Sequence, residues 1–206
     1  MDMALYTGLV SFVIVMSVTP GPNNLMLMSS SALFGVRATL PTWLVVNLGF
    51  NILLVAAVFG LGELVARFPW AMLVVKFGGA SWLLWMAWLF ARAGLSTAGA
   101  GGKPAASERS RPIRSFEAAL FQWVNPKALL MTLSAAGAYI ALADTPGERA
   151  VLMVGTFILF GSPCGLLWVF AGGALKRFMA DGRSARILNI AIAAILLVTT
   201  LMIVLG

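Results

Sequence analysis

Two short motifs place proline and asparagine inside long apolar stretches. TPGPNN covers residues 19–24 within a run of 34 uncharged residues, 3–36, and NPK covers residues 125–127. Proline removes a backbone hydrogen bond from a helix, so each motif predicts a break between two half-helices. Pro22 suits the first turn of the helix after the first break, and Asn125 suits the cap of the helix after the second, with a proline following it.

The chemistry that such breaks could perform is the binding of an anion. A helix N-terminus has free N–H groups and about half a positive elementary charge. Lys127 adds a full charge, and placing it at the centre of a membrane helix costs about 2.5 to 3.5 kcal/mol, so it requires a partner. Glu117, the nearest acidic residue in the sequence, lies about 15 Å away along a helix. The carboxylate of a bound substrate is therefore a suitable counter-ion.

Two asparagines of the next apolar stretch could complete such a site. Asn47 and Asn51 are four residues apart, so they share one face of a helix. They follow Pro41 at a distance that brings them to about the depth of the breaks, where they could bind the other polar groups of a zwitterion. The predicted substrate-binding residues are Pro20, Gly21, Pro22, Asn23, Asn24, Asn47, Asn51, Asn125, Pro126 and Lys127. No catalytic residue, cofactor or metal site is predicted.

Each of these features also has a purely structural interpretation. A proline motif can be a packed kink, because neighbouring helices can satisfy the freed carbonyls. Lys127 could extend toward the membrane surface or bind backbone carbonyls, and the asparagines could hold helices together. Glu63 and Glu117 lie near the ends of their apolar stretches. They are interfacial residues in this interpretation, and candidates for carrying a coupling proton in a transporter.

The composition places these motifs in a membrane protein. Hydrophobic residues make up 61% of the 206 residues and charged residues 10%, which is too few charges to cover a soluble globule. A transmembrane helix needs about 20 apolar residues. The stretches that qualify are residues 5–33, 39–64, 70–91, 116–142, 151–175 and 187–205. The expected fold is an all-α membrane protein with six transmembrane helices, of which the first and fourth are broken.

One connection between these stretches is much longer than the others. Residues 93–115 are basic and rich in glycine, serine, alanine and proline, which predicts a flexible linker. The linker separates a first half, residues 1–92, from a second half, residues 116–206. Three spans per half give the halves opposite orientations, so they are expected to form two inverted three-helix repeats, an arrangement common in secondary transporters.

The basic residues are unevenly divided between the two sides of the predicted membrane. Ten of the fourteen fall on the side of the linker, three fall on the opposite side, and Lys127 lies within a span. The positive-inside rule then places the linker in the cytoplasm and both termini outside it. Because the basic residues form no single patch, the net charge of +7 does not predict nucleic-acid binding. With Cys164 as the single cysteine and no histidine, neither a disulfide nor a transition-metal site is expected.

Several motifs together resemble a known protein family. TPGPNN, LFGVRATLP, GLGELV, KFGGASWLLWMAW and FEAALFQWVNPKA resemble the LysE/RhtB family of amino acid exporters, over nearly the whole chain except the linker. TPGPNN and FQWVNPKA look most like the branch that exports cysteine and O-acetylserine. The resemblance implies a six-span protein of the bacterial inner membrane, driven by the proton-motive force and often dimeric. Such proteins expel surplus amino acids such as homoserine, threonine, leucine, lysine or cysteine.

The sequence therefore predicts a secondary exporter of small neutral amino acids or their derivatives, and not an enzyme. Its partners would be the amino acid substrate, protons as coupling ion, the lipid bilayer and a second copy of the chain. The two halves would rock about the site, and no ATP-binding motif offers another source of energy. Three alternatives remain open. One is a membrane thiol oxidoreductase, which the single Cys164 fits poorly, and the others are a metal exporter and a membrane subunit that does not itself transport.

Overall fold

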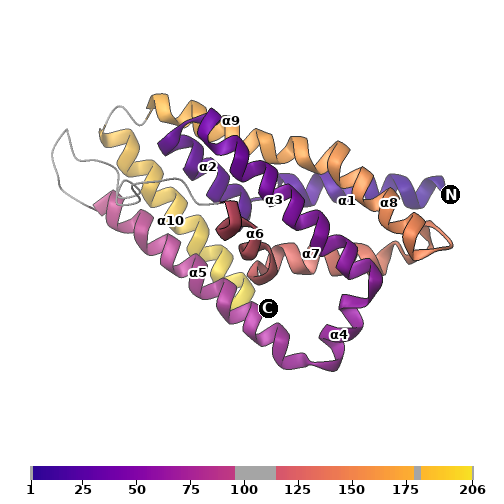
Figure 1. Ribbon diagram of the computed structural model, residues 1–206. Helices are drawn as coiled ribbons and strands as arrows, with labels where there is room; N and C mark the ends of the chain where they lie inside the picture. Colours follow the sequence, from indigo (N-terminus) through magenta and orange to yellow (C-terminus); the bar gives the residue numbers. More distant parts are fainter. Residues whose placement is uncertain (1, 96–114, 179–181, 206) are drawn as a thin grey trace.

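The structure is a computed structural model that describes residues 2–95, 115–178 and 182–205. Every regular element within these residues is a helix, and they contain no strand (Figure 1). The prediction of an all-α fold is confirmed. The six apolar stretches of the sequence correspond to the main helical segments, and the interruptions within these segments determine the shape of the site.

The first apolar stretch is broken where the TPGPNN motif predicts. Helix α1 (Met3–Val18) and helix α2 (Pro22–Phe34) are bent by 49° relative to each other. Gly21 joins them in an extended conformation that any residue can adopt, with φ of −166°. The predicted break is confirmed, and Pro22 occupies the first position of the second helix, where its missing N–H costs no hydrogen bond.

The second apolar stretch contains a turn of π-helix that the sequence analysis did not predict. Helix α3 (Val36–Ala56) continues through η1 (Ala57–Leu61) into α4 (Gly62–Arg67). Gly60, within η1, has φ of 116°, a left-handed conformation that glycine adopts without strain. The span expected over residues 39–64 is present, but it contains this additional irregularity because Gly60 leaves the helical conformation.

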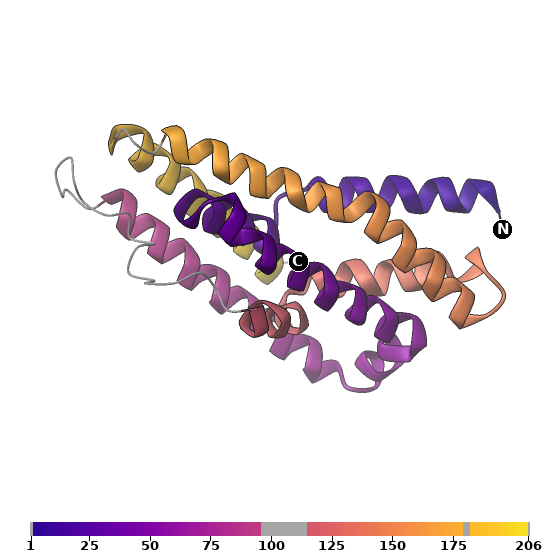
Figure 2. The same ribbon diagram turned by 45° about the horizontal axis from the view of Figure 1, so that its top comes forward.

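The fifth apolar stretch has a π-helical turn in a similar place. Helix α8 (Pro146–Thr156) continues through η4 (Phe157–Gly161) into α9 (Ser162–Phe178). Helix α1 lies beside α8 and η4 (Figure 2). Single π-helical turns inside α-helices occur frequently at functional sites. The second and fifth stretches thus each contain a π-helical turn, in addition to the breaks in the first and fourth.

The fourth apolar stretch is broken at the NPK motif, as predicted. Helix α6 (Ser115–Val124) ends one residue before Asn125, and α7 (Pro126–Ala138) begins one residue after it and leads into the short η3 (Ile140–Leu142). The predicted linker is helical at its described ends, because helix α5 continues to residue 95 and α6 begins at residue 115. The rest of the linker lies outside the described residues.

The third and sixth stretches form a pair of helices. Helix α5 (Pro69–Leu95) and helix α10 (Gly182–Leu205) pack side by side along most of their length (Figure 1). Their buried contact is made of aliphatic and aromatic side chains. The largest of these are Leu83, Met86, Phe90, Ile192 and Leu196. The opposite faces of both helices expose apolar side chains, as expected of helices surrounded by lipid.

Only part of the predicted set of spans passes a test of length and apolar character within the described residues. The segments Val36–Arg67, Leu73–Arg92 and Pro146–Leu175 pass it, and the bent pair Met3–Val18 with Pro22–Ala32 would make a fourth. The stretches at 116–142 and 187–205 are helical but do not meet this criterion. A membrane protein with several spans is supported, and the arrangement of six spans in inverted repeats stays a prediction.

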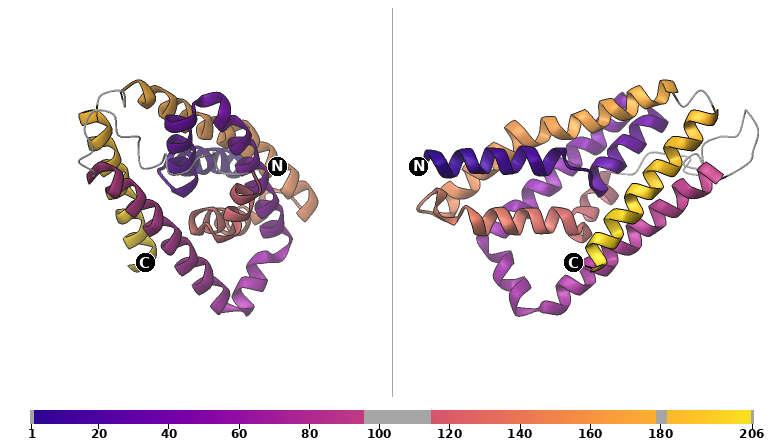
Figure 3. Two further views of the ribbon diagram at one scale, coloured as in Figure 1. Left: turned by 60° about the vertical axis from the view of Figure 1, so that its left-hand side comes forward. Right: turned by 180° about the vertical axis from the view of Figure 1, so that it is seen from behind.

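The helix ends fall into two groups at opposite ends of the molecule. The α2–α3 connection, the end of α5, the end of α9 and the start of α10 lie at one end, whereas the N-terminus, the α4–α5 turn and the η3–α8 connection lie toward the other (Figure 3). Arg37, Arg92 and Arg186 belong to helices at the first end, and Arg67 and Arg149 to helices at the second. Arginines thus occur at both ends, and the orientation inferred from the distribution of basic residues stays a prediction.

Candidate substrate-binding site

A cavity of about 90 Å³ lies where the two proline-containing breaks meet. About 10 to 15 Å³ of such space holds one water molecule, so the cavity has room for several waters or for one small solute. The predicted binding residues that line it are Gly21, Pro22, Asn23, Asn24, Asn47, Asn51, Asn125 and Lys127. The other lining residues are Met16, Ser17, Leu27, Val46, Phe50, Ala128, Met131, Phe157, Gly161 and Gly165. Pro20 and Pro126 belong to the breaks but do not line the cavity.

Lys127 connects the second break to the first. Its Nζ donates a hydrogen bond to the Thr19 carbonyl at 2.6 Å and a longer one to the Pro20 carbonyl at 3.4 Å. These carbonyls follow the C-terminus of α1, where backbone oxygens carry partial negative charge. The ammonium group has three donors, so it retains at least one for a ligand in the cavity. Lys127 therefore makes the backbone contacts expected of a structural residue, and it also lines the cavity, as a substrate-binding residue must.

Gly21 allows Lys127 to lie this close to the first break. A Cβ atom added to Gly21 would lie 2.6 Å from Lys127 Cδ and 3.1 Å from its Nζ. Because the backbone of Gly21 is extended, the glycine is explained by this close approach and not by its conformation. Asn24 completes the first break by donating from its Nδ2 to the carbonyls of Ser17 at 2.9 Å and Thr19 at 3.0 Å.

The two helices that begin at the breaks differ in their caps. No side chain caps α2, since the residue before it is Gly21, so the N–H groups of Asn23 and Asn24 lack an acceptor within the helix. At α7, by contrast, Asn125 Oδ1 accepts from the N–H groups of Lys127 at 3.1 Å and Ala128 at 3.4 Å. The predicted cap is confirmed, and it occupies the amides of α7. The amides that remain for an anion are those of α2.

Gln122 joins the two breaks and was missed as a site residue. Asn23 Nδ2 donates to Gln122 Oε1 at 2.8 Å, and Gln122 Nε2 donates to Asn23 Oδ1 at 3.3 Å and to the Ala118 carbonyl at 3.0 Å. Gln122 is fully buried. The available signal was an uncharged but strongly polar residue in an apolar helix, three residues before the break, which requires a partner when buried.

The structure assigns different surroundings to Asn47 and Asn51. Asn47 Nδ2 donates to the Trp43 carbonyl at 2.8 Å, and its Oδ1 accepts from Ser162 Oγ at 2.7 Å. Asn47 therefore ties α3 to the start of α9. Asn51 Nδ2 donates to the Asn47 carbonyl at 2.8 Å. The sequence analysis did not single out Ser162, because its role depends on a partner more than a hundred residues away.

The sequence matches known proteins over almost the whole chain. A family model described as "LysE type translocator" matches residues 14–206. The chain belongs to the LysE family. It is 29% identical to a cysteine/O-acetylserine efflux protein of Klebsiella pneumoniae over 95% of both chains, and 28% identical to one of Escherichia coli over 96% of both chains. No solved structure matches. The resemblance drawn from the sequence motifs is confirmed, and the part of the chain that matches the LysE family contains the whole cavity lining.

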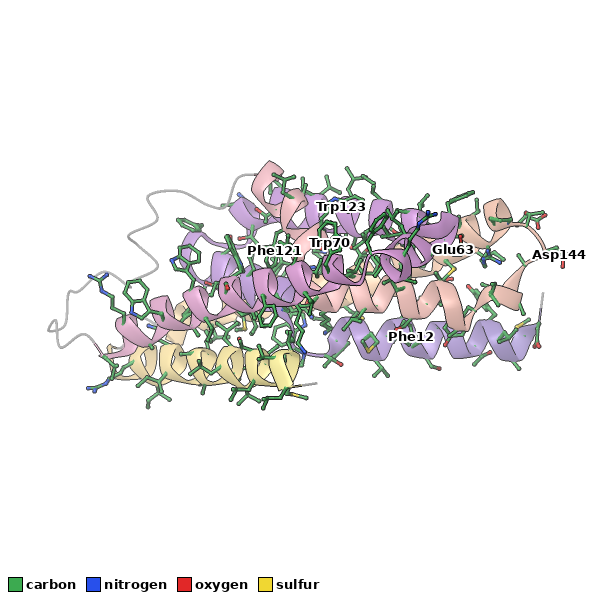
Figure 4. The ribbon with its side chains drawn as sticks, turned by 90° about the horizontal axis from the view of Figure 1, so that it is seen from below. Phe12, Glu63, Trp70, Phe121, Trp123 and Asp144 are labelled. Carbon is green, nitrogen blue, oxygen red and sulfur yellow. The ribbon has the colours of Figure 1, made fainter. Side chains whose placement is uncertain are left out.

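Of the two acidic residues considered for proton coupling, the structure describes only the side chain of Glu63, and it does not line the cavity. Glu63 is exposed on α4, and Figure 4 shows it apart from Phe121 and Trp123 of α6. Glu117 is the third residue of α6, but its side chain lies outside the described residues. In this LysE-family chain, Lys127 is the one charged side chain among the described residues that line the cavity.

The alternatives to a translocator have little support in the described residues of this LysE-family chain. Cys164 of α9 is buried, and its Sγ donates to the Phe160 carbonyl of η4 at 3.1 Å. A thiol oxidoreductase would need a second thiol for this one to pair with. No group of three or more histidine, cysteine, aspartate or glutamate residues that could hold a metal ion occurs in the described ranges. The family description names a translocator and not an enzyme.

Proposed function

We propose that the protein is a secondary exporter of small neutral amino acids or their derivatives, of the cysteine and O-acetylserine type, in a bacterial inner membrane. The observation that carries the proposal is the cavity between the two breaks, whose one charged lining side chain among the described residues is Lys127. The printed names of the relatives, cysteine/O-acetylserine efflux proteins, support the same substrate class.

The substrate carboxylate would bind at the first break. The N–H groups of Asn23 and Asn24 lie at the positive end of α2, and Lys127 Nζ binds the Thr19 and Pro20 carbonyls of the same break. A carboxylate can accept from all of these donors at once, and charge-assisted hydrogen bonds are about twice as strong as neutral ones. The carboxylate would also be the counter-ion of Lys127, whose ammonium group otherwise binds backbone carbonyls.

The rest of the cavity suits a short and largely apolar side chain. Leu27, Val46, Phe50, Met131 and Phe157 contribute apolar lining, and the volume is small. A long cationic side chain such as that of lysine would bring its charge toward Lys127 or into this apolar wall without a partner. The cavity therefore favours small neutral amino acids over basic ones.

The proposed transport mechanism is alternating access between two inverted three-helix halves. Breaks at α1–α2 and α6–α7, and π-helical turns η1 and η4, occur in matching positions of the two halves and support this arrangement. Proton coupling is part of the proposal: one charge moved through about 150 mV supplies about 3.5 kcal/mol, enough for a concentration ratio of a few hundred. The uneven distribution of basic residues supports termini outside the cytoplasm and residues 93–115 inside it.

Counterflow of radiolabelled cysteine and O-acetylserine into proteoliposomes tests this proposal. The wild-type protein is expected to exchange both, and Lys127→Ala to lower the rate about ten- to hundredfold, the loss expected for a hydrogen bond to a charged group. Lys76→Ala is the matched control, because Lys76 lies on α5 and does not line the cavity. Wild-type counterflow by Lys127→Ala would remove the lysine from the site.

The shape of the cation provides a second test at the same position. Lys127→Arg keeps the charge but replaces a compact ammonium group by a planar guanidinium group. Since Lys127 Nζ fits between two carbonyls of the first break, we expect the variant to bind substrate more weakly and to exchange it more slowly than wild type. Full activity of the arginine variant would show that charge alone is sufficient.

A further inference from the structure

We propose that Asn51 Oδ1 is the acceptor that binds the amino group of the substrate, and that it makes the cavity selective for α-amino acids over acids that lack this group. This inference rests on the proposed function, and it assigns a partner to the substrate group that the first break does not bind. It also separates Asn51 from Asn47, which sequence reasoning treated as equivalent.

The orientation of the Asn51 amide is fixed by its own helix. Its Nδ2 donates to the Asn47 carbonyl at 2.8 Å. Turning the amide by half a revolution would bring Oδ1 against that carbonyl, and two acceptors would then face each other. Asn51 therefore presents its oxygen, and not its nitrogen, as the group free for another partner.

This oxygen is a buried acceptor that has no donor. Four buried side-chain polar atoms lack a hydrogen-bond partner in the part of the chain that the structure describes: Ser31 Oγ, Asn51 Oδ1, Trp82 Nε1 and Arg149 Nε. Of these four residues only Asn51 lines the cavity. Buried polar atoms are normally hydrogen-bonded, so a solute that enters the cavity is expected to supply the missing donor.

The other asparagines of the cavity each make at least one hydrogen bond. Asn47 binds Trp43 and Ser162, Asn125 caps α7, Asn23 pairs with Gln122, and Asn24 donates to the carbonyls of Ser17 and Thr19. These bonds hold helices together or end them. Asn24 also donates only from its Nδ2, but it lies at the positively charged first break. Asn51 differs because its Oδ1 is a buried acceptor on α3 that has no donor.

The charge distribution assigns this acceptor to the amino group. No carboxylate occurs among the described lining residues, and Lys127 with the α2 amides makes the first break positive. A substrate ammonium group is repelled from that end and attracted to a neutral oxygen on α3. An ammonium group also gives the stronger hydrogen bond to such an oxygen than a hydroxyl or a thiol does.

Cysteine and two of its fragments test the assignment in proteoliposomes. The probe is radiolabelled L-cysteine, kept reduced, and the competitors are unlabelled cysteine, 3-mercaptopropionate, which lacks the amino group, and cysteamine, which lacks the carboxylate. Wild-type protein is expected to prefer cysteine over 3-mercaptopropionate by about ten- to hundredfold. Asn51→Leu is expected to reduce this preference to near unity while cysteamine stays a poor competitor.

Two further variants control for structural effects. Asn51→Asp keeps an acceptor at this position and is expected to retain the preference for cysteine. Asn189→Leu replaces an asparagine that is also buried, on α10 and outside the cavity lining, and is expected to leave the preference unchanged. Loss of selectivity with Asn51→Leu, together with its retention in both controls, supports the assignment.

The outcomes separate this inference from the proposed function. Wild-type counterflow of cysteine with an unchanged preference in Asn51→Leu overturns the role of Asn51 alone. A wild-type protein that takes 3-mercaptopropionate as readily as cysteine overturns it without any variant, even if Asn51→Leu fails to fold. Absence of cysteine and O-acetylserine counterflow in wild type overturns both the function and this inference.

Discussion

At the α1–α2 break, the second helix begins after Gly21 and has no side-chain cap, whereas at the α6–α7 break Asn125 caps α7 from within the same segment. The carbonyls that end α1 are satisfied by Asn24 and by Lys127, which comes from the other half of the chain. The first break thus depends on a distant partner and leaves its amides open. At the second break the α7 amides are occupied by Asn125, and this difference supports the proposal that a ligand binds at the first break.

A second contrast concerns the glycines that pack against each break. Gly21 makes room for the flexible side chain of Lys127, whereas Gly79 of α5 makes room for the backbone of the second break. A Cβ added at Gly79 would lie 2.8 Å from the Val124 carbonyl and would also collide with the ring of Pro126. A flexible lysine can move away from such a clash, but a backbone carbonyl and a proline ring cannot.

The largest effect on stability is therefore expected for Gly79→Ala. The added methyl group would push α5 away from the second break and lower the free energy of unfolding by about 3 kcal/mol. Thermal unfolding in detergent would show a clearly lower Tm. Gly78→Ala is the neighbouring control, because a Cβ there meets nothing within 4 Å. Equal Tm values for the two variants would contradict the close packing at the second break.

A smaller loss is expected when the amide pair between the breaks is cut. Gln122→Leu leaves the Asn23 amide without its partner, and a buried unsatisfied polar group costs about 1 to 3 kcal/mol. Asn23→Leu should cost a similar amount. The double variant should cost less than the sum, since no buried amide then lacks a partner. Strictly additive losses of stability in this double-mutant cycle would show that the two side chains do not interact.

Loss of the cap at the second break is expected to have a moderate effect. Asn125→Ala removes the acceptor for the Lys127 and Ala128 N–H groups and should cost about 0.5 to 2 kcal/mol. Asn125→Asp keeps the acceptor and should retain most of the stability. If alanine and aspartate variants unfold at the same temperature, the side chain does not act as a cap.

The smallest effect on stability, but a clear effect on transport, is expected for Gly21→Ala. The extended backbone accepts alanine, and Lys127 can move its side chain away from the new methyl group. Tm should change little, while the cysteine counterflow rate falls because Lys127 leaves the first break. Gly8→Ala on α1 is the control, since its Cβ would make only ordinary contact with Tyr139 at 3.6 Å. Normal transport by Gly21→Ala would show that the position of Lys127 is not critical.

Local chemistry explains which parts of this architecture the sequence could predict. Proline, glycine and asparagine act on the backbone within a few residues, so both breaks and the cap at Asn125 could be predicted from short motifs. The π-helical turn with Gly60 could not, because an isolated glycine in an apolar stretch gives no indication of its backbone angle. The π-helical turn η4 could not be predicted either, because its sequence differs little from that of the helices on both sides of it.

The partners of the site were harder to predict than its position. Asn47 and Asn51 share one helix face, and only the contact with Ser162 distinguishes them. Gln122 and Asn23 are 99 residues apart, so no local pattern could pair them. The carbonyl partners of Lys127 were considered from the sequence, but their combination with the cavity depends on how the two halves pack.

A structure determined experimentally with bound cysteine would test the central claim most directly. We predict that its carboxylate lies within about 2.7 to 3.2 Å of the Asn23 or Asn24 N–H and of Lys127 Nζ, between the two breaks. A ligand bound elsewhere, with Lys127 still occupied only by the carbonyls of Thr19 and Pro20, would contradict the account.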